Sequence, residues 1–232
     1  MTARPSDAGE RRAGLVELAE LAELAAGLVT SGHRAILGVA GAPGSGKTTF
    51  VEALIAEVAA ARGPDWVAHL PMDGFHLADA QLRRLGALDR KGAPDTFDGD
   101  GYAHTLHRVR ANPEETIYVP GFERTLEQPI AAALQIPPEA QLVVTEGNYL
   151  LLGQQPWTAA RAELDEVWYV TTDDEVRIAR LVARHVEFGK SPDAAAEWVA
   201  TSDEKNADLV SASSVRADRV VVNAAGGWHS PR

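Results

Sequence analysis

The sequence predicts an α/β fold in which helices cover both faces of a mostly parallel central sheet, a three-layer sandwich. Short apolar runs of strand length alternate with segments of helical periodicity along the chain, as is typical of parallel sheets. These runs are continuous rather than interrupted by polar residues, which indicates strands covered on both faces. The first run, 35–40, leads through a glycine-rich loop into a helical segment.

The loop over residues 41–48 reads Gly-Ala-Pro-Gly-Ser-Gly-Lys-Thr and fits G-x-x-x-x-G-K-[ST], the loop that holds nucleotide phosphates. Glycines let backbone N–H groups point at an anion, and the following helix adds the positive potential of its N-terminus. We expect Lys47 to reach the β- and γ-phosphates and Thr48 to bind Mg²⁺. The alternative is an ordinary glycine-rich turn. The predicted nucleotide-binding residues here are Gly41, Ala42, Pro43, Gly44, Ser45, Gly46, Lys47, Thr48 and Thr49.

The other elements follow from periodicity and from glycines and prolines. We expect a disordered leader over 1–9 and an amphipathic helix over 10–31, packed onto the domain rather than in a coiled coil. Apolar runs predict strands at 66–70, 117–119, 142–146, 166–170 and 219–222. Helical patterns cover 77–86, 102–111, 174–188 and 192–209, with a long loop at 89–101 and an irregular excursion or small hairpin at 120–138. Residues 10–225 then form a single domain, followed by a loose tail over 226–232.

Length, charge and composition restrict the function classes. A chain of 232 residues can build one α/β domain with a sizeable core. Its formal net charge of −11 argues against a nucleic-acid partner or an anionic membrane, so ATP would have to be met by a local cluster of cations. The chain has no Cys, no run of 18 apolar residues and no secretory signal pattern. We therefore expect a cytoplasmic protein without a membrane segment, and a homodimer is compatible with the sequence.

Polar groups lie directly after three predicted strands: the Lys47-Thr48 pair, Asp73 and Glu146. Ligands of parallel sheets bind beyond the carboxyl ends of the strands, so these groups should meet at one cleft. Asp73 is a candidate base that accepts a hydroxyl proton during phosphoryl transfer, the alternative being a turn aspartate that binds its own backbone. Glu146 is a candidate Mg²⁺ ligand, the alternative being an N-cap or surface carboxylate.

Three arginines share one face of the helix predicted near 174–188, at Arg177, Arg180 and Arg184. Such a face can close over ATP as a lid, in which Arg177 and Arg180 bind the nucleotide and Arg184 offsets charge on the transferring phosphoryl. The alternative is a solvated face paired with nearby carboxylates. Candidates for an acceptor pocket, each with a weak signal, are His76, Arg90, Lys91, Asp95, Phe97, Phe122, Arg124, Asn148 and Tyr149.

These segments together carry a resemblance. The loop at 41–48 is followed in order by Met-Asp-Gly-Phe-His at 72–76, Arg-Lys-Gly-Ala-Pro-Asp-Thr-Phe-Asp at 90–98, Glu-Gly-Asn-Tyr at 146–149 and the arginine helix. The set resembles the P-loop kinase group that contains uridine kinase, phosphoribulokinase and bacterial type I pantothenate kinase. Within the group it is similar to a bacterial branch of nucleoside/nucleotide and fructose-transport-system kinases. The likeness covers about residues 33–222.

The resemblance implies a P-loop NTPase fold and an ATP- and Mg²⁺-dependent kinase whose catalytic residues are Lys47, Asp73, Glu146 and Arg184. It also implies that 90–98 is the acceptor loop. Ala93 stands where uridine kinases usually have His, and the segment 120–124 lacks the Tyr usual in pantothenate kinases. The expected acceptor is a small-molecule hydroxyl of a ketose-like sugar or a nucleoside. A pantothenate-type kinase, a nucleotide-switch ATPase and a non-catalytic nucleotide-binding protein remain as alternatives.

Overall fold

The computed structural model describes residues 15–231, so the leader expected at 1–9 lies outside the described residues. A seven-stranded sheet with the order β1-β9-β8-β7-β2-β6-β3 forms the centre. Its parallel strands are β2 (Ala35–Ala40), β3 (Val67–Pro71), β6 (Leu142–Glu146), β7 (Glu166–Thr171) and β8 (Arg219–Ala224). At one edge, β9 (Gly227–Pro231) and β1 (Leu15–Glu17) add antiparallel strands.

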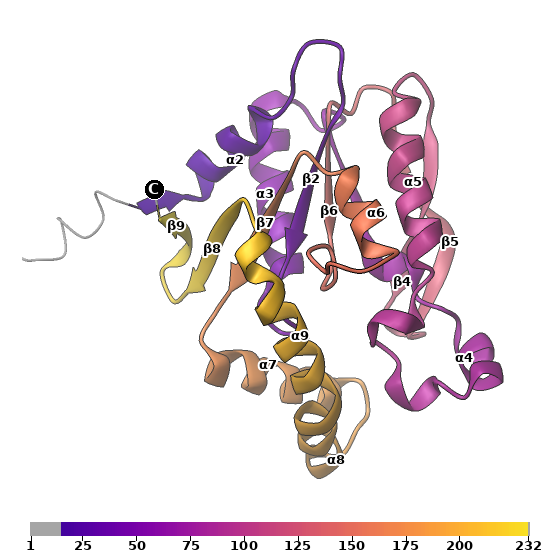
Figure 1. Cartoon of the computed structure of the whole chain (residues 1–232). Coiled ribbons are helices and arrows are strands. Elements are labelled where there is room, and N and C mark those ends of the chain that lie inside the picture. The colour runs from indigo at the N-terminus through magenta and orange to yellow at the C-terminus, as the bar shows by residue number, and fades with distance from the viewer. Residues whose placement is uncertain (1–14, 232) are drawn as a thin grey trace, which may run out of the picture.

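Helices cover both faces of this sheet, so the predicted α/β three-layer architecture is confirmed (Figure 1). One face packs against α2 (Leu18–Ala26) and α3 (Lys47–Arg62). The other packs against α5 (Gly99–Ala111), α6 (Trp157–Ala162) and α9 (Glu204–Ser213). Every residue of β2 and β6 is buried, which explains their uninterrupted apolar sequences. Among residues 15–231, none of the helices combines the length and apolarity needed to cross a bilayer.

Both ends of the described chain differ from the prediction. Of the helix expected over 10–31, residues 10–14 lie outside the described residues, residues 15–17 pair with β9 as a strand, and the described helix is α2. The tail expected to be loose is strand β9, which pairs with β8 and β1. Trp228 anchors it, since its ring lies 6.0 Å from that of Phe50 between centroids. The edge pairing and this aromatic contact order a segment whose composition gives no strong strand signal.

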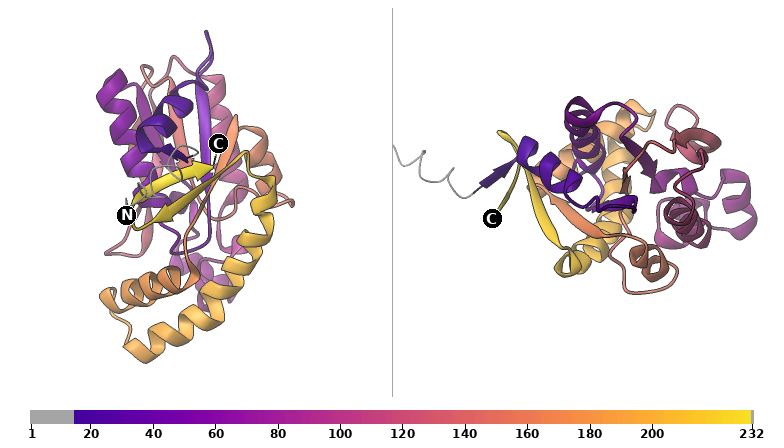
Figure 2. Two further views of the ribbon diagram at one scale, coloured as in Figure 1. Left: turned by 90° about the vertical axis from the view of Figure 1, so that its left-hand side faces the viewer. Right: turned by 90° about the horizontal axis from the view of Figure 1, so that it is seen from above.

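Two insertions interrupt the alternation of strands and helices, and the second of them projects beyond the carboxyl ends of the parallel strands (Figure 2). The excursion at 120–138 is part of a hairpin, β4 (Ile117–Glu123) and β5 (Gln128–Ile136), accompanied by the short helix α4 (Asp79–Leu85). The second insertion is a helical arm of α7 (Asp174–Glu187) and α8 (Pro192–Trp198), which continues through a π-helical turn, Val199–Asp203, into α9. The single helix predicted at 192–209 is therefore α8, the π turn and most of α9.

Candidate active site

The glycine-rich loop is shaped by close backbone approaches. Gly44 and Gly46 have φ angles of 78° and 89°, in the left-handed region that favours glycine. A Cβ at Gly46 would lie 2.3 Å from the side-chain nitrogen of Asn223. That nitrogen donates a 3.0 Å hydrogen bond to the carbonyl of Ser45, so β8 braces the loop from the side.

Several groups of the loop suit a phosphate. Gly46 is the N-cap of α3, so the first N–H groups of that helix face the loop. The hydroxyl of Ser45 is buried and has no hydrogen-bond partner among residues 15–231, and such groups are costly unless a ligand or water satisfies them. Burial lowers the pKa of the Lys47 ammonium, while Glu146 and Asp73 oppose this effect. Lys47 donates a 2.7 Å hydrogen bond to Oδ1 of Asn148.

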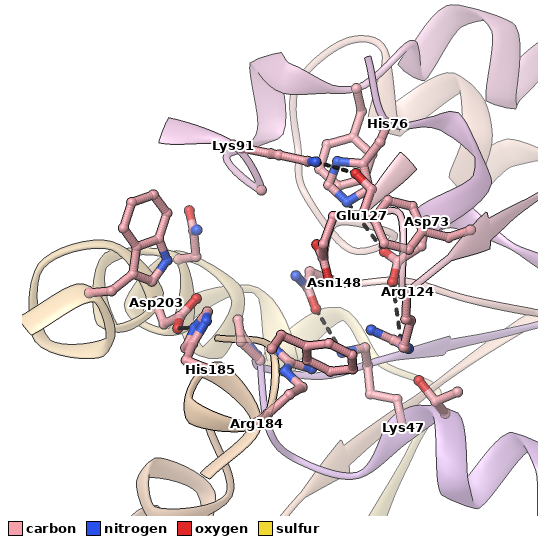
Figure 3. A pocket seen from close by; sticks show the side chains of 18 of the residues that line it. Lys47, Asp73, His76, Lys91, Arg124, Glu127, Asn148, Arg184, His185 and Asp203 are labelled. Atoms are coloured by element: carbon pink, nitrogen blue, oxygen red, sulfur yellow. Dashed lines mark hydrogen bonds and ion pairs between the residues drawn. The ribbon is translucent and has the colours of Figure 1, made fainter. Parts of the chain in front are cut away.

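The carboxylates predicted at strand ends come together with the loop. Glu146 closes β6, and its neighbour across the sheet is Pro71, the last residue of β3. Asp73 lies two residues later in a 3₁₀ turn, Met72–Phe75. These two carboxylates, Lys47 and Thr48 line one cavity of about 450 Å³ at the carboxyl ends of the strands (Figure 3).

The donor set beside the loop fits Mg²⁺. The Thr48 hydroxyl donates a 3.3 Å hydrogen bond to Oε1 of Glu146, so two oxygen ligands converge. Magnesium typically takes one or two carboxylates together with waters and substrate phosphates. Within residues 15–231, no cluster of three or more His, Cys, Asp or Glu residues could hold a metal by itself. Burial, and next the charge of Asp73, raises the pKa of Glu146 well above its usual range against the attraction of Lys47.

The side of the cavity where the acceptor residues are predicted is a wall of aromatic and charged groups. The His76 ring lies 4.0 Å from the Phe97 ring and 5.0 Å from the Phe122 ring between centroids. Burial lowers the pKa of His76 to about 4 although Asp73 attracts its proton, so this histidine is neutral at pH 7. Arg124 reaches to 3.8 Å from the Asp73 carboxylate. The Lys91 ammonium is 2.8 Å from Asp79 and also donates to the carbonyl of Glu127.

The three arginines of α7 have different surroundings. Arg184 lines the cavity, in which it faces Lys47 (Figure 3). Arg177 is only 4% exposed and pairs with Asp174 at 3.0 Å and Glu204 at 2.7 Å, so its guanidinium is engaged within the arm. Arg180 approaches the loop, with a guanidinium nitrogen 3.5 Å from the position of a Cβ on Gly46. Arg177 therefore packs behind the loop at Gly44 and is absent from the cavity lining.

Some predicted acceptor residues lie outside the cavity. Arg90 and Asp95 form an ion pair of 2.7 Å with each other, and both are half exposed. The side chain of Tyr149 is buried, and its hydroxyl donates to the carbonyl of Gly92, so it supports the acceptor loop from behind. Thr49 is exposed on α3. The residues in the predicted acceptor set that do line the cavity are His76, Lys91, Phe97, Phe122, Arg124 and Asn148, together with Asp73.

The sequence did not reveal a second group of lining residues. It consists of Leu88 and Glu127 on the acceptor side and Phe188, Lys190, Trp198, Asp203 and Asn206 on the helical arm, beside His185. A sequence signal exists only for Phe188 and Trp198, which are large apolar residues in a strongly charged segment around Gly189. Asp203 and Asn206 are ordinary helix residues in the sequence, and the structure places the first in the π turn and the second in α9.

Comparisons with known proteins agree with this geometry, although no protein-family model matches the chain. An Aspergillus versicolor protein named "ATP-dependent kinase-like protein notR'" is 39% identical over 59% of this chain and 85% of its own length. A Schizosaccharomyces pombe protein, "Putative uridine kinase C227.14", is 31% identical over 73% of this chain and 74% of its own.

A solved structure of the same kind is the "putative fructose transport system kinase" from Silicibacter sp. TM1040. It has a TM-score of 0.79 and 33% identity, and the match covers 88% of this chain and 98% of that chain. The expected resemblance is thus confirmed at the level of sequence and fold. The chain belongs to the P-loop kinases related to uridine kinase and pantothenate kinase, and it is an ATP-using phosphotransferase that acts on small molecules.

Proposed function

We propose that the protein transfers the γ-phosphoryl group of ATP, in the presence of Mg²⁺, to a hydroxyl of a small metabolite, a ketose-like sugar or a nucleoside. One observation carries this proposal: Asp73, Lys47 and Arg184 line the same cavity from three different elements. A carboxylate able to take a proton therefore faces cations able to receive a phosphoryl group. A protein that only binds or hydrolyses nucleotide does not need this acceptor cavity.

In the proposed reaction the acceptor hydroxyl lies against Asp73. Its oxygen forms a bond to the γ-phosphorus as the bond from that phosphorus to the β–γ bridging oxygen breaks, and its proton passes to Asp73. The products are ADP and a phosphate monoester. Lys47 and the N–H groups of the loop hold the phosphates, and Arg184 offsets charge on the transferring group. Thr48 and Glu146 would hold Mg²⁺, which neutralises phosphate charge.

Arg124 and Asn148 support this arrangement indirectly. Arg124 forms an ion pair with Asp73 at 3.8 Å and so keeps a positive charge beside this carboxylate. Asn148 accepts the hydrogen bond from Lys47 and holds the ammonium at the floor of the cavity. Arg177 and Arg180 act through the loop, the first by packing behind it and the second by approaching Gly46.

The test is a product screen with the full chain. ATP and Mg²⁺ are incubated with single sugars, nucleosides or pantothenate, ADP release is followed, and each product is identified by mass. The proposal predicts ADP release that depends on one acceptor and yields its monophosphate. Slow ADP release that is the same with and without every acceptor would instead indicate an ATPase and would refute the proposal.

A further inference from the structure

The wall of the cavity formed by the helical arm carries polar side chains that the proposed phosphoryl transfer does not use. They are His185 on α7, Trp198 at the end of α8, Asp203 in the π turn and Asn206 on α9. In Figure 3, His185 and Asp203 lie across the cavity from Lys91 and His76, with Asn148 between the two sides. An acceptor bound against Asp73 would therefore extend toward this wall.

Asp203 is held in place rather than free to rotate. Nε2 of His185 lies 2.8 Å from Oδ2 of Asp203, and the two side chains are only 18% and 12% exposed. The Trp198 ring packs edge-on against His185 with centroids 6.3 Å apart. The π turn that contains Asp203 inserts extra backbone into the helix, a feature that recurs at functional sites. One carboxylate oxygen of Asp203 is hydrogen-bonded to His185, and Asp203 lines the cavity.

Asn206 supplies an independent observation. The residue is 9% exposed and lines the cavity, yet its side chain makes no hydrogen bond to any residue in the range 15–231. An amide carries two N–H donors and one acceptor oxygen, and near-buried polar groups normally have partners. Asp203 and Asn206 are three positions apart, so they lie on the same face of the helix. Together they offer acceptors and donors side by side.

The opposite wall does not suit a nucleobase. The His76 ring contacts both Phe97 and Phe122, with its plane tilted by 31° and 49° against theirs, and Phe97 also contacts Tyr149 and Trp157 edge-on. Among the described residues, no contacting pair of these rings is parallel, so they do not form a slot into which a flat base could insert. On the helical arm, the aromatic side chains that line the cavity are Phe188 and Trp198, and the Lys190 ammonium lies 4.5 Å from the centroid of the Trp198 ring.

We propose that this wall binds the distal hydroxyls of a neutral polyol, a sugar or sugar alcohol, and so determines the acceptor. The inference rests on the proposed kinase function. Asp203 accepts hydrogen bonds from one hydroxyl, Asn206 donates to and accepts from its neighbour, and Trp198 covers the C–H face. His185 positions the Asp203 carboxylate. The carboxylate of Asp203 at this wall disfavours an acceptor that carries a carboxylate of its own.

The test uses D-fructose as the polyol probe, with uridine, pantothenate and D-glycerate as competing acceptor classes. The variants are Asp203→Asn and Asn206→Ala, and the matched control is Asp208→Asn, an exposed aspartate on the same helix. Losing a hydrogen bond to a charged group corresponds to about a 10- to 100-fold change. We expect Asp203→Asn to raise the KM for D-fructose by about that factor, with the KM for ATP within about twofold of the control.

Thermal melting shows whether each variant remains folded, and Asn206→Ala gives a second reading if Asp203→Asn does not fold. Unchanged acceptor KM values in both variants would overturn the inference, as would a wild-type enzyme that phosphorylates only uridine, pantothenate or D-glycerate. The last result would leave the kinase function intact. If no acceptor is phosphorylated and ATP is hydrolysed regardless, the kinase proposal fails and the inference fails with it.

Discussion

The ammonium of Lys47 donates a 2.7 Å hydrogen bond to the side-chain oxygen of Asn148. The first residue of α3 is thereby tied to the segment that follows β6, and the lysine is directed across the cavity floor rather than into solvent. The same geometry keeps it close to Glu146, whose charge opposes the effect of burial on the lysine. The lysine that we propose to bind phosphate is therefore directed into the cavity by a contact within the protein.

Replacing Lys47 should lower kcat/KM more than replacing Asn148. Lys47→Met deletes the cation itself and should lower kcat/KM by about 10²- to 10³-fold, the cost of losing one donor to a developing anion. Asn148→Ala leaves the ammonium of Lys47 in place but removes its hydrogen-bond acceptor, and should lower kcat/KM by about tenfold. Steady-state kinetics measure both, with Lys205→Met as the control because Lys205 is an exposed residue of α9. Equal activity of Lys47→Met and the control would contradict the assignment.

Replacing two arginines of α7 should have different effects, one on stability and the other on activity. Arg177 is nearly buried and paired with Glu204 at 2.7 Å, so Arg177→Met should reduce the free energy of unfolding by about 2 kcal/mol. Arg184→Met removes a cavity cation and should lower kcat at least tenfold with little change in stability. Urea denaturation and kinetics on both variants check this. If Arg177→Met were fully stable while losing ATP affinity, the guanidinium would be a direct nucleotide ligand.

Gly74 should not tolerate a side chain. A Cβ there would lie 2.4 Å from the carbonyl oxygen of Pro120 in β4, and backbone atoms cannot move aside cheaply. Gly74→Ala should therefore move the hairpin away from the 3₁₀ turn that carries Asp73. We expect the free energy of unfolding to fall by about 1–3 kcal/mol and the KM for the acceptor to rise. Gly226→Ala is the control, because nothing lies within 4 Å of its Cβ position. Equal stability of the two variants would argue against this packing.

His69 should make the free energy of unfolding depend on pH in the acid range. Burial lowers the pKa of His69 to about 4, against the attraction of Asp73. Between that value and about 6.5, the unfolded chain binds a proton that the folded chain does not. The free energy of unfolding should therefore fall as the pH drops from 6.5 to 4, by about 3 kcal/mol from this group.

His69→Gln should remove that part of the pH dependence. Urea denaturation at pH 7 and pH 4 measures it, and His104→Gln serves as the control because His104 is exposed on α5. The difference in unfolding free energy between the two pH values should be smaller in His69→Gln than in His104→Gln. Identical pH profiles would show that His69 is protonated equally in both states.

The sequence predicted those parts of the molecule in which local pattern and final structure coincide. The run Ala35–Ala40 is strand β2 with the predicted bounds, because a fully buried parallel strand must be apolar throughout. The residues Thr48, Asp73 and Glu146 meet because parallel strands bring their carboxyl ends to one edge. The α7 helix ends within a residue of its predicted bound, where Gly189 follows.

The remainder depended on contacts that no local pattern encodes. Strand β9 exists because β8 and β1 supply partners and Phe50 packs against Trp228. Arg177 and Arg184 are equivalent on a helical wheel, yet Glu204 on another helix binds one and the cavity surrounds the other. Asp203 lines the cavity from a π turn, which has no sequence signature here.

The central claim is that Asp73 accepts the proton of a bound hydroxyl. Asp73→Asn keeps the shape of the side chain and removes its basicity. With an acceptor identified by the product screen, the rate of phosphoryl transfer in a single turnover is measured for both proteins, together with ATP affinity. We predict unchanged ATP affinity and a rate lower by about 10²- to 10⁴-fold. A variant that binds ATP normally and transfers the phosphoryl group at the wild-type rate would contradict the account.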